Sequence, residues 1–114
     1  MDCIFCRIGS GDIPATIVTR NEHAIAFRDL HPQAPTHVLV IPIEHVASTA
    51  HLSGTDIARV LGQVTALAAQ VASDLGLGDA GYRMVVNTGP QGGQTVDHLH
   101  VHLLGGRQMH WPPG

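Results

Sequence analysis

The segment DHLHVHLLGG, residues 97–106, places three histidines at alternate positions. Because alternate side chains of an extended strand leave the same face, we expect His98, His100 and His102 to share one face, with the aliphatic residues between them turned toward the core. Neighbouring histidines on that face are about 6.5–7 Å apart along the backbone. Such a face could hold a metal ion, present a neutral imidazole as a nucleophile, or lie exposed to solvent.

A glycine-rich segment, NTGPQGGQT, comes directly before the histidines. Gly92 and Gly93 could turn their backbone N–H groups toward an anion, and Asn87, Gln94 and Thr95 add side-chain donors. The same composition is common in an ordinary hairpin turn. Beside a row of histidines we favour the anion-binding interpretation, because fixed donors stabilise the charge that develops on a phosphate under attack.

Two cysteines near the start of the chain, Cys3 and Cys6, form a CxxC pattern. The first residues contain no apolar run long enough for a secretory signal, and no segment is long enough to span a bilayer. We therefore expect a cytoplasmic protein, in which a stable disulfide is disfavoured. The pair could bind a metal, act as a redox dithiol or remain as buried thiols.

Composition and charge limit the class of partner. The 114 residues are 44% hydrophobic and 13% charged, with a net charge of −3 and no basic run. This length predicts a single domain, residues 1–114. Proteins that bind nucleic acid or an anionic membrane carry an excess of basic residues, and this sequence does not. A small-molecule partner is therefore expected.

The elements that must position these residues follow from hydrophobic periodicity. Apolar residues repeat every three or four positions across 55–75, which predicts one long amphipathic helix. Short β-rich runs separated by turn residues predict strands elsewhere. The expected elements are a short helix at 2–8, a hairpin of 15–21 and 23–29, strands at 37–42, 82–87 and 97–104, and the long helix. This order predicts an α+β fold with a mainly antiparallel five-stranded sheet.

The stretch HLHVHLL, residues 98–104, matches His-φ-His-φ-His-φ-φ, where φ is apolar. It resembles the signature of the histidine triad (HIT) superfamily of nucleotide hydrolases and transferases. The segments FRDLHPQAPTHVLVIP (27–42) and GPQGGQTVDHLHVHLLGG (89–106) also match, and GGRQMHWPPG (105–114) resembles the carboxyl terminus of the Hint branch. The resemblance runs nearly end to end and implies a HIT-like fold.

By this resemblance the protein hydrolyses purine nucleoside 5′-phosphoramidates, such as adenosine 5′-monophosphoramidate, or conjugates of the aminoacyl-adenylate type, to the nucleoside monophosphate. His100 would be the nucleophile and form a covalent nucleotidyl-histidine that water resolves. His102 would assist the leaving amine, to which an imidazolium can give a proton, while His98 and His37 complete the hydrogen-bonded set. This chemistry needs no metal.

The resemblance also implies a nucleotide-binding site. Asp29 would hold the ribose hydroxyls, and Asn87, Gly93 and Thr95 would contact the α-phosphate. The purine slot would be lined by Phe5, Ile8, Ile13, Phe27 and Leu30.

Some members of the superfamily complete a structural zinc site with two histidines, which here gives Cys3, Cys6, His45 and His98. A zinc-bound His98 could not also donate freely in catalysis. The resembling family forms a homodimer whose tail, here 105–114, approaches the partner's active site. Trp111 would then shape leaving-group selectivity, unless the tail is a frayed end.

Three alternative functions remain open. The first is a dinucleoside polyphosphate hydrolase or nucleotidyl transferase of the same superfamily, which the GGRQMHWPPG tail disfavours. The second is a hydrolase that uses the three triad histidines as metal ligands, and the third is a non-catalytic, nucleotide-binding zinc protein.

Asp97 stands where an aromatic residue is common in the Hint branch, which leaves substrate choice open. We interpret His23, His31 and His51 as loop or surface residues.

Overall fold

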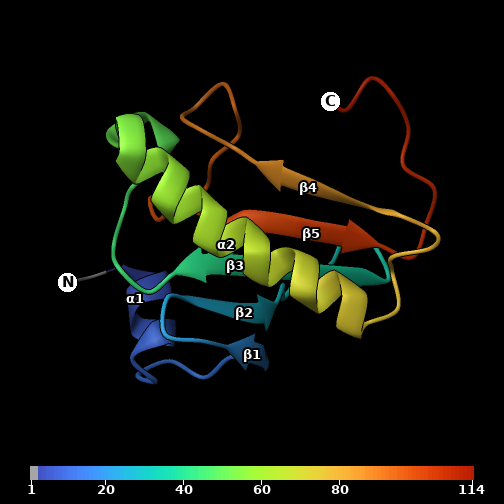
Figure 1. The fold of residues 1–114 in the computed structure, drawn as a ribbon, viewed down its shortest axis with the longest axis horizontal. Coiled ribbons are helices and arrows are strands. Elements are labelled where there is room, and N and C mark those ends of the chain that lie inside the picture. The colour runs from blue at the N-terminus through green and yellow to red at the C-terminus, as the bar shows by residue number, and fades with distance from the viewer. Residues whose placement is uncertain (1–2) are drawn as a thin grey trace.

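The fold is an antiparallel sheet between two helices of unequal length (Figure 1). The computed structural model describes residues 3–114. The strands lie in the order β1-β2-β3-β5-β4, and each neighbouring pair is antiparallel. The elements are α1 Ile4–Gly9, β1 Ile17–Arg20, β2 Ala24–Arg28, β3 Thr36–Pro42, a 3₁₀ turn Thr49–His51, α2 Gly54–Asp74, β4 Tyr82–Val86 and β5 Val101–Gly105. This confirms the predicted α+β class and five-stranded sheet.

Alternating side chains on the central strands build two apolar layers. Ala26 of β2 and Val40 of β3 pair directly and face α2, whereas their neighbours Phe27 and Leu39 face the opposite side. Phe5 of α1 packs on that opposite side. The sheet therefore separates a large core under α2 from a smaller apolar cluster that includes α1.

The long helix α2 begins after Ser53 and ends at Asp74, close to the predicted 55–75. Its buried residues recur on one face and are Val60, Val64, Leu67, Ala68, Val71 and Ala72. Small residues on this face let the helix lie close to the sheet. Gly76 then adopts a positive φ of 74°, which suits the left-handed stop expected after the helix.

The short first helix starts later than predicted, at Ile4, because Cys3 is its N-cap and its sulfur accepts a hydrogen bond from the Cys6 N–H. Asp2, which falls within the predicted helix, lies outside the described residues. Within residues 3–114 the structure contains no helix that is long and apolar enough to cross a membrane.

The last strand is shorter than the predicted 97–104. Its pairing with β3 runs from Thr36 opposite Gly105 to Val40 opposite Val101. Before Val101 the chain leaves this ladder, and the Leu99 N–H donates instead to the carbonyl of Val46, at 2.7 Å. His98 and His100 therefore precede the strand, although β3 itself continues to Pro42 in its pairing with β2.

Candidate active site and metal site

The alternation predicted for the triad is kept even where the ladder is absent. Leu99 and Val101 join the core under α2. His98 and His100 emerge on the other face, where both rings meet the ring of Phe5 edge to face. The ring centroids of His100 and His102 are 5.0 Å apart, so these two histidines are direct neighbours.

His100 has a defined tautomer. Its Nδ1 lies 2.8 Å from the main-chain oxygen of His98. A carbonyl oxygen only accepts, so the neutral ring carries its proton on Nδ1 and leaves a lone pair on Nε2. The residue is 4% exposed and lines the cavity described below. An unprotonated ring nitrogen at a cavity wall is the arrangement that a nitrogen nucleophile requires.

A chain of hydrogen bonds orients the neighbouring rings. The Gln33 N–H donates to Nδ1 of His37 at 3.0 Å, so the His37 proton lies on Nε2. That nitrogen is 2.9 Å from Nδ1 of His102, which accepts. The neutral His102 ring therefore carries its own proton on Nε2. Asp29 stands beside this relay, with Oδ2 3.4 Å from Nε2 of His37.

Burial makes these rings poor bases. It lowers the pKa of His37, against the opposing charge of Asp29. The pKa of His102 falls to about 4, first through burial and then through the neighbouring His100 and His37. In the free protein at neutral pH, His102 is thus uncharged. An anionic phosphate bound beside it would raise this pKa, because an opposite charge favours the protonated ring.

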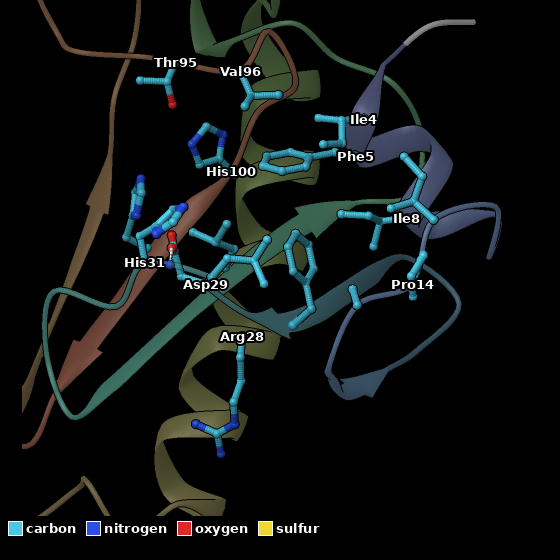
Figure 2. Close-up of a pocket in the computed structure, with 16 residues that line it drawn as sticks. Ile4, Phe5, Ile8, Pro14, Arg28, Asp29, His31, Thr95, Val96 and His100 are labelled. Atoms are coloured by element: carbon cyan, nitrogen blue, oxygen red, sulfur yellow. Dashed lines mark hydrogen bonds between the residues drawn. The ribbon is translucent and has the colours of Figure 1, made fainter.

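A cavity of about 330 Å³ opens beside the histidines. Figure 2 shows Phe5 and Ile8 of α1 on one wall, with His100 and Thr95 at the other end. The predicted purine-slot residues all line it: Phe5, Ile8, Ile13, Phe27 and Leu30. Phe5 and Phe27 meet edge to face at 5.5 Å. Leu30 is 88% exposed, which places it at the rim.

The same cavity brings in residues that the sequence analysis missed. His31, interpreted as a surface residue, lines it beside Asp29, and its N–H donates to the Asp29 carboxylate at 2.7 Å. Further lining residues are Ile4, Pro14, Ala15, Arg28, Leu39 and Val96. Two sequence features could have pointed to these residues: the alternating side chains of β2 and the Asp-x-His turn. Neither feature indicates a cavity unless the packing of α1 is known.

In the glycine-rich segment, most of the donors expected to bind a phosphate either do not line the cavity or are already hydrogen-bonded within the loop. Of the residues assigned to the phosphate, Thr95 lines the cavity, whereas Asn87 and Gly93 are not among its lining residues. The Gly93 N–H donates to the Pro90 carbonyl at 3.1 Å, so it is occupied within the turn. The Gln94 amide is also occupied, because its Oε1 accepts the N–H of Gly89 and its Nε2 donates to two main-chain carbonyls. Gln94 holds the loop rather than offering a donor to a ligand.

A second cluster joins Cys3, Cys6, His45 and His98, whose ligand atoms all lie within 4.8 Å of one another. Nε2 of His98 lies 2.9 Å from the Pro42 carbonyl and therefore carries the proton, which leaves the Nδ1 lone pair toward the cysteines. Nδ1 of His98 is 3.3 Å from the Cys3 sulfur, 3.5 Å from the Cys6 sulfur and 3.2 Å from Nδ1 of His45.

These separations fit a tetrahedral zinc ion. Zn–N bonds of about 2.0–2.1 Å and Zn–S bonds of about 2.3 Å give tetrahedral edges of about 3.3–3.8 Å. Two sulfur and two nitrogen donors are also the set that zinc prefers. Burial raises the pKa of the Cys6 thiol, as do the hydrogen bond and charge of Cys3, so a nearby cation would favour the Cys6 thiolate that binds zinc.

The triad does not form one metal site. His98 belongs to the cysteine cluster, and His102 lies near Asp29 and His37 in a separate group. In that separate group, Nδ1 of His37 and Nδ1 of His102 already accept hydrogen bonds. The geometry therefore disfavours the hydrolase in which His98, His100 and His102 together hold a catalytic metal.

The carboxyl-terminal tail is held to the domain at two points. A guanidinium N–H of Arg83 donates to the carbonyl of His110 at 2.8 Å, and Nε of Arg107 donates to the carbonyl of Gln33 at 2.9 Å. Trp111 is 83% exposed in the single chain. Its predicted place at a partner's site stays a prediction.

Known proteins are similar to this chain in sequence and in structure. A HIT domain is matched over residues 10–109. A 14 kDa zinc-binding protein of Zea mays is 50% identical over 113 residues, covering 97% of this chain and 87% of that protein. The crystal structure of a HIT family hydrolase from Legionella pneumophila Philadelphia 1 superimposes with a TM-score of 0.95 at 48% identity, covering 99% of this chain and all of the other.

A histidine triad protein from Clostridium difficile also superimposes, with a TM-score of 0.93 at 37% identity over 96% of this chain and 95% of the other. The match covers most of the chain and includes the triad itself. The chain belongs to the HIT family of histidine triad proteins.

Proposed function

We propose that this protein is a hydrolase that converts purine nucleoside 5′-phosphoramidates to nucleoside monophosphates through a nucleotidyl intermediate on His100. The observation that carries the proposal is the bare Nε2 of His100 at the wall of a cavity that is apolar at one end and polar at the other. The name of the Legionella relative, a HIT family hydrolase, supports the reaction class.

The cavity suits the parts of such a substrate. Phe5, Phe27 and the isoleucines offer an apolar slot for a base. The Asp29 carboxylate, at the polar end, can accept hydrogen bonds from ribose hydroxyls. The hydroxyl of Thr95 lies on the same side as His100, where it can donate to a phosphate oxygen.

The reaction proceeds in two displacements. Nε2 of His100 attacks phosphorus, the P–N bond breaks, and the amine leaves with a proton from His102, whose ring becomes protonated when the anionic phosphate binds beside it. Water then attacks the same phosphorus, the His100–phosphorus bond breaks, and the proton of the water returns to His102. The products are the free amine and the nucleoside monophosphate.

We propose structural zinc at Cys3, Cys6, His45 and His98, in line with the name of the Zea mays relative. When bound, zinc would tie these chain segments together, and no step of the reaction passes through it. We also propose a homodimer in which the exposed Trp111 reaches the partner's cavity.

The decisive experiment is hydrolysis of adenosine 5′-monophosphoramidate by the parent, His100→Ala and His23→Ala. His23 is an exposed histidine in the turn between β1 and β2, so it is the matched control. We expect about 10³-fold or greater loss in His100→Ala, as for other removed nucleophiles, little change in His23→Ala, and an adenylyl adduct on His100 in the quenched parent. Turnover that survives in His100→Ala would refute the mechanism. AMP binding without turnover in the parent would indicate the non-catalytic alternative.

A further inference from the structure

His98 belongs to two sites at once. Its Nδ1 faces the cysteine sulfurs and His45, and its Nε2–H is held by the Pro42 carbonyl. The main-chain oxygen of the same residue accepts the Nδ1–H of His100. The ring is fully buried, so it has little freedom to turn. The ring that faces the cluster and the carbonyl that sets the tautomer of His100 thus belong to one residue.

The helix α1 provides a second connection between the cluster and the cavity. Phe5 stands between the two cysteines in sequence, and its ring contacts His98 at 5.9 Å and His100 at 5.2 Å between centroids. The same ring contacts Phe27 in the cavity wall. A helix of six residues is not stable alone, so its place depends on what holds it to the domain. Cys3 and Cys6 stand at its start and in its first turn.

We propose that metal binding at Cys3, Cys6, His45 and His98 positions the nucleophile and the wall of the nucleotide cavity, with His98 and Phe5 as the positioning residues. The inference rests on the proposed function for the identity of the nucleotide. Loss of the metal frees α1 and removes the tie between the His98 ring and the two cysteines. The protein then binds a purine nucleotide more weakly and reacts more slowly, although the metal contacts neither the nucleotide nor His100.

A purely stabilising metal would behave differently. Most of the apolar core lies under α2, on the far face of the sheet from the cluster. A metal that only adds stability would change the melting temperature and leave the nucleotide affinity of the folded protein unchanged. Nucleotide affinity and the state of the His100 ring therefore separate the two cases.

The test uses His45→Ala, His45→Cys and His23→Ala beside the zinc-loaded and chelator-treated parent. His45 is exposed and is not among the cavity-lining residues, so its substitution alters the cluster without removing a side chain from the cavity wall. Cysteine at position 45 keeps four ligands. Zinc content is measured by elemental mass spectrometry, AMP affinity by calorimetry, and the His100 ring nitrogens by ¹⁵N NMR.

We expect His45→Ala and the chelated parent to bind AMP at least about tenfold more weakly, which is the range seen when groups that support a metal-linked site are lost. Their His100 signals should lose the single Nδ1–H form. Zinc should restore the chelated parent but not His45→Ala, and His45→Cys should recover most of the affinity. His23→Ala should match the parent within about twofold.

Equal AMP affinity and an unchanged His100 spectrum in zinc-free protein would overturn the coupling. Loss of the whole fold without zinc, seen by circular dichroism, would also overturn it, because the metal would then hold the sheet rather than α1. A parent that binds AMP but hydrolyses no phosphoramidate refutes the proposed function and leaves the coupling supported if affinity still follows zinc. If AMP does not bind at all, the nucleotide site is refuted, and the His100 spectrum alone decides the positioning.

Discussion

Acidification should destabilise this protein through His102, and the size of the effect follows from its surroundings. Burial, His100 and His37 lower the pKa of His102 from 6.5 to about 4, while the carboxylate of Asp29 opposes the shift. As the pH falls below 6.5, the unfolded chain takes up a proton at this position and the folded chain does not. The free energy of unfolding therefore falls between pH 6.5 and about 4 and is insensitive to this group above pH 7.

The expected loss is modest but measurable. Between pH 7.5 and 5, a shift of this size corresponds to about 2 kcal/mol. The ring is only part-buried, so solvent screening reduces the expected value to about 1 kcal/mol. His102→Asn is the matched variant, because Oδ1 of asparagine can accept the hydrogen bond from Nε2 of His37 and the side chain does not titrate.

Urea unfolding of the parent and His102→Asn at pH 7.5 and pH 5 provides the measurement. The parent should lose about 1 kcal/mol more than the variant on acidification. Both proteins keep the same cysteine and histidine cluster, so pH effects on a bound metal cancel in the comparison. Equal losses in the two proteins, or a smaller loss in the parent, would refute the assignment of a part-buried, neutral ring at position 102.

Two further substitutions test the loop and the separation of the two faces. A methyl group at Gly92 would collide with the backbone of Thr88, so Gly92→Ala should cost about 1–3 kcal/mol of stability and weaken AMP binding. Gly78→Ala, where an added Cβ meets nothing within 4 Å, is its control; equal urea midpoints and AMP affinities for the two variants would contradict the argument. Val64→Ala on α2 should cost about 2 kcal/mol through a core cavity and leave turnover of the folded protein unchanged, because Val64 lies in the core across the sheet. A drop in its specific activity at temperatures where it remains folded would contradict that separation.

The periodic elements could be predicted from the sequence because their signals are local. The period of two around His100 predicts which side chains share a face, and this holds even outside the hydrogen-bonded ladder. The start of β5 could not be predicted, because it depends on a contact distant in sequence: the Leu99 N–H bonds the carbonyl of Val46 while β3 continues to Pro42. The long helix was predicted within a residue or so at each end, since its apolar repeat and the following Gly76 are both present in sequence.

The site could be predicted by residue type but not by hydrogen-bond partner. Gln94 reads as a free donor in the sequence, and only folding shows that Ala47, distant in the chain, accepts from its amide. The neutral state of His102 likewise depends on burial and on His37, 65 positions away. His31 was missed because its contribution to the cavity arises only when α1 closes the opposite wall.

Neighbouring side chains of β5 face opposite sides of the sheet, and this limits how the strand can shift. Leu103 packs beneath α2 while its neighbour His102 serves the opposite face, so slipping this strand by one residue would exchange the two sets. Imidazoles would then enter the hydrophobic core, and leucines would enter the active site. Strand slippage therefore cannot move the triad out of phase without disrupting the core. The position of the histidines and the packing of the core are therefore set by one constraint.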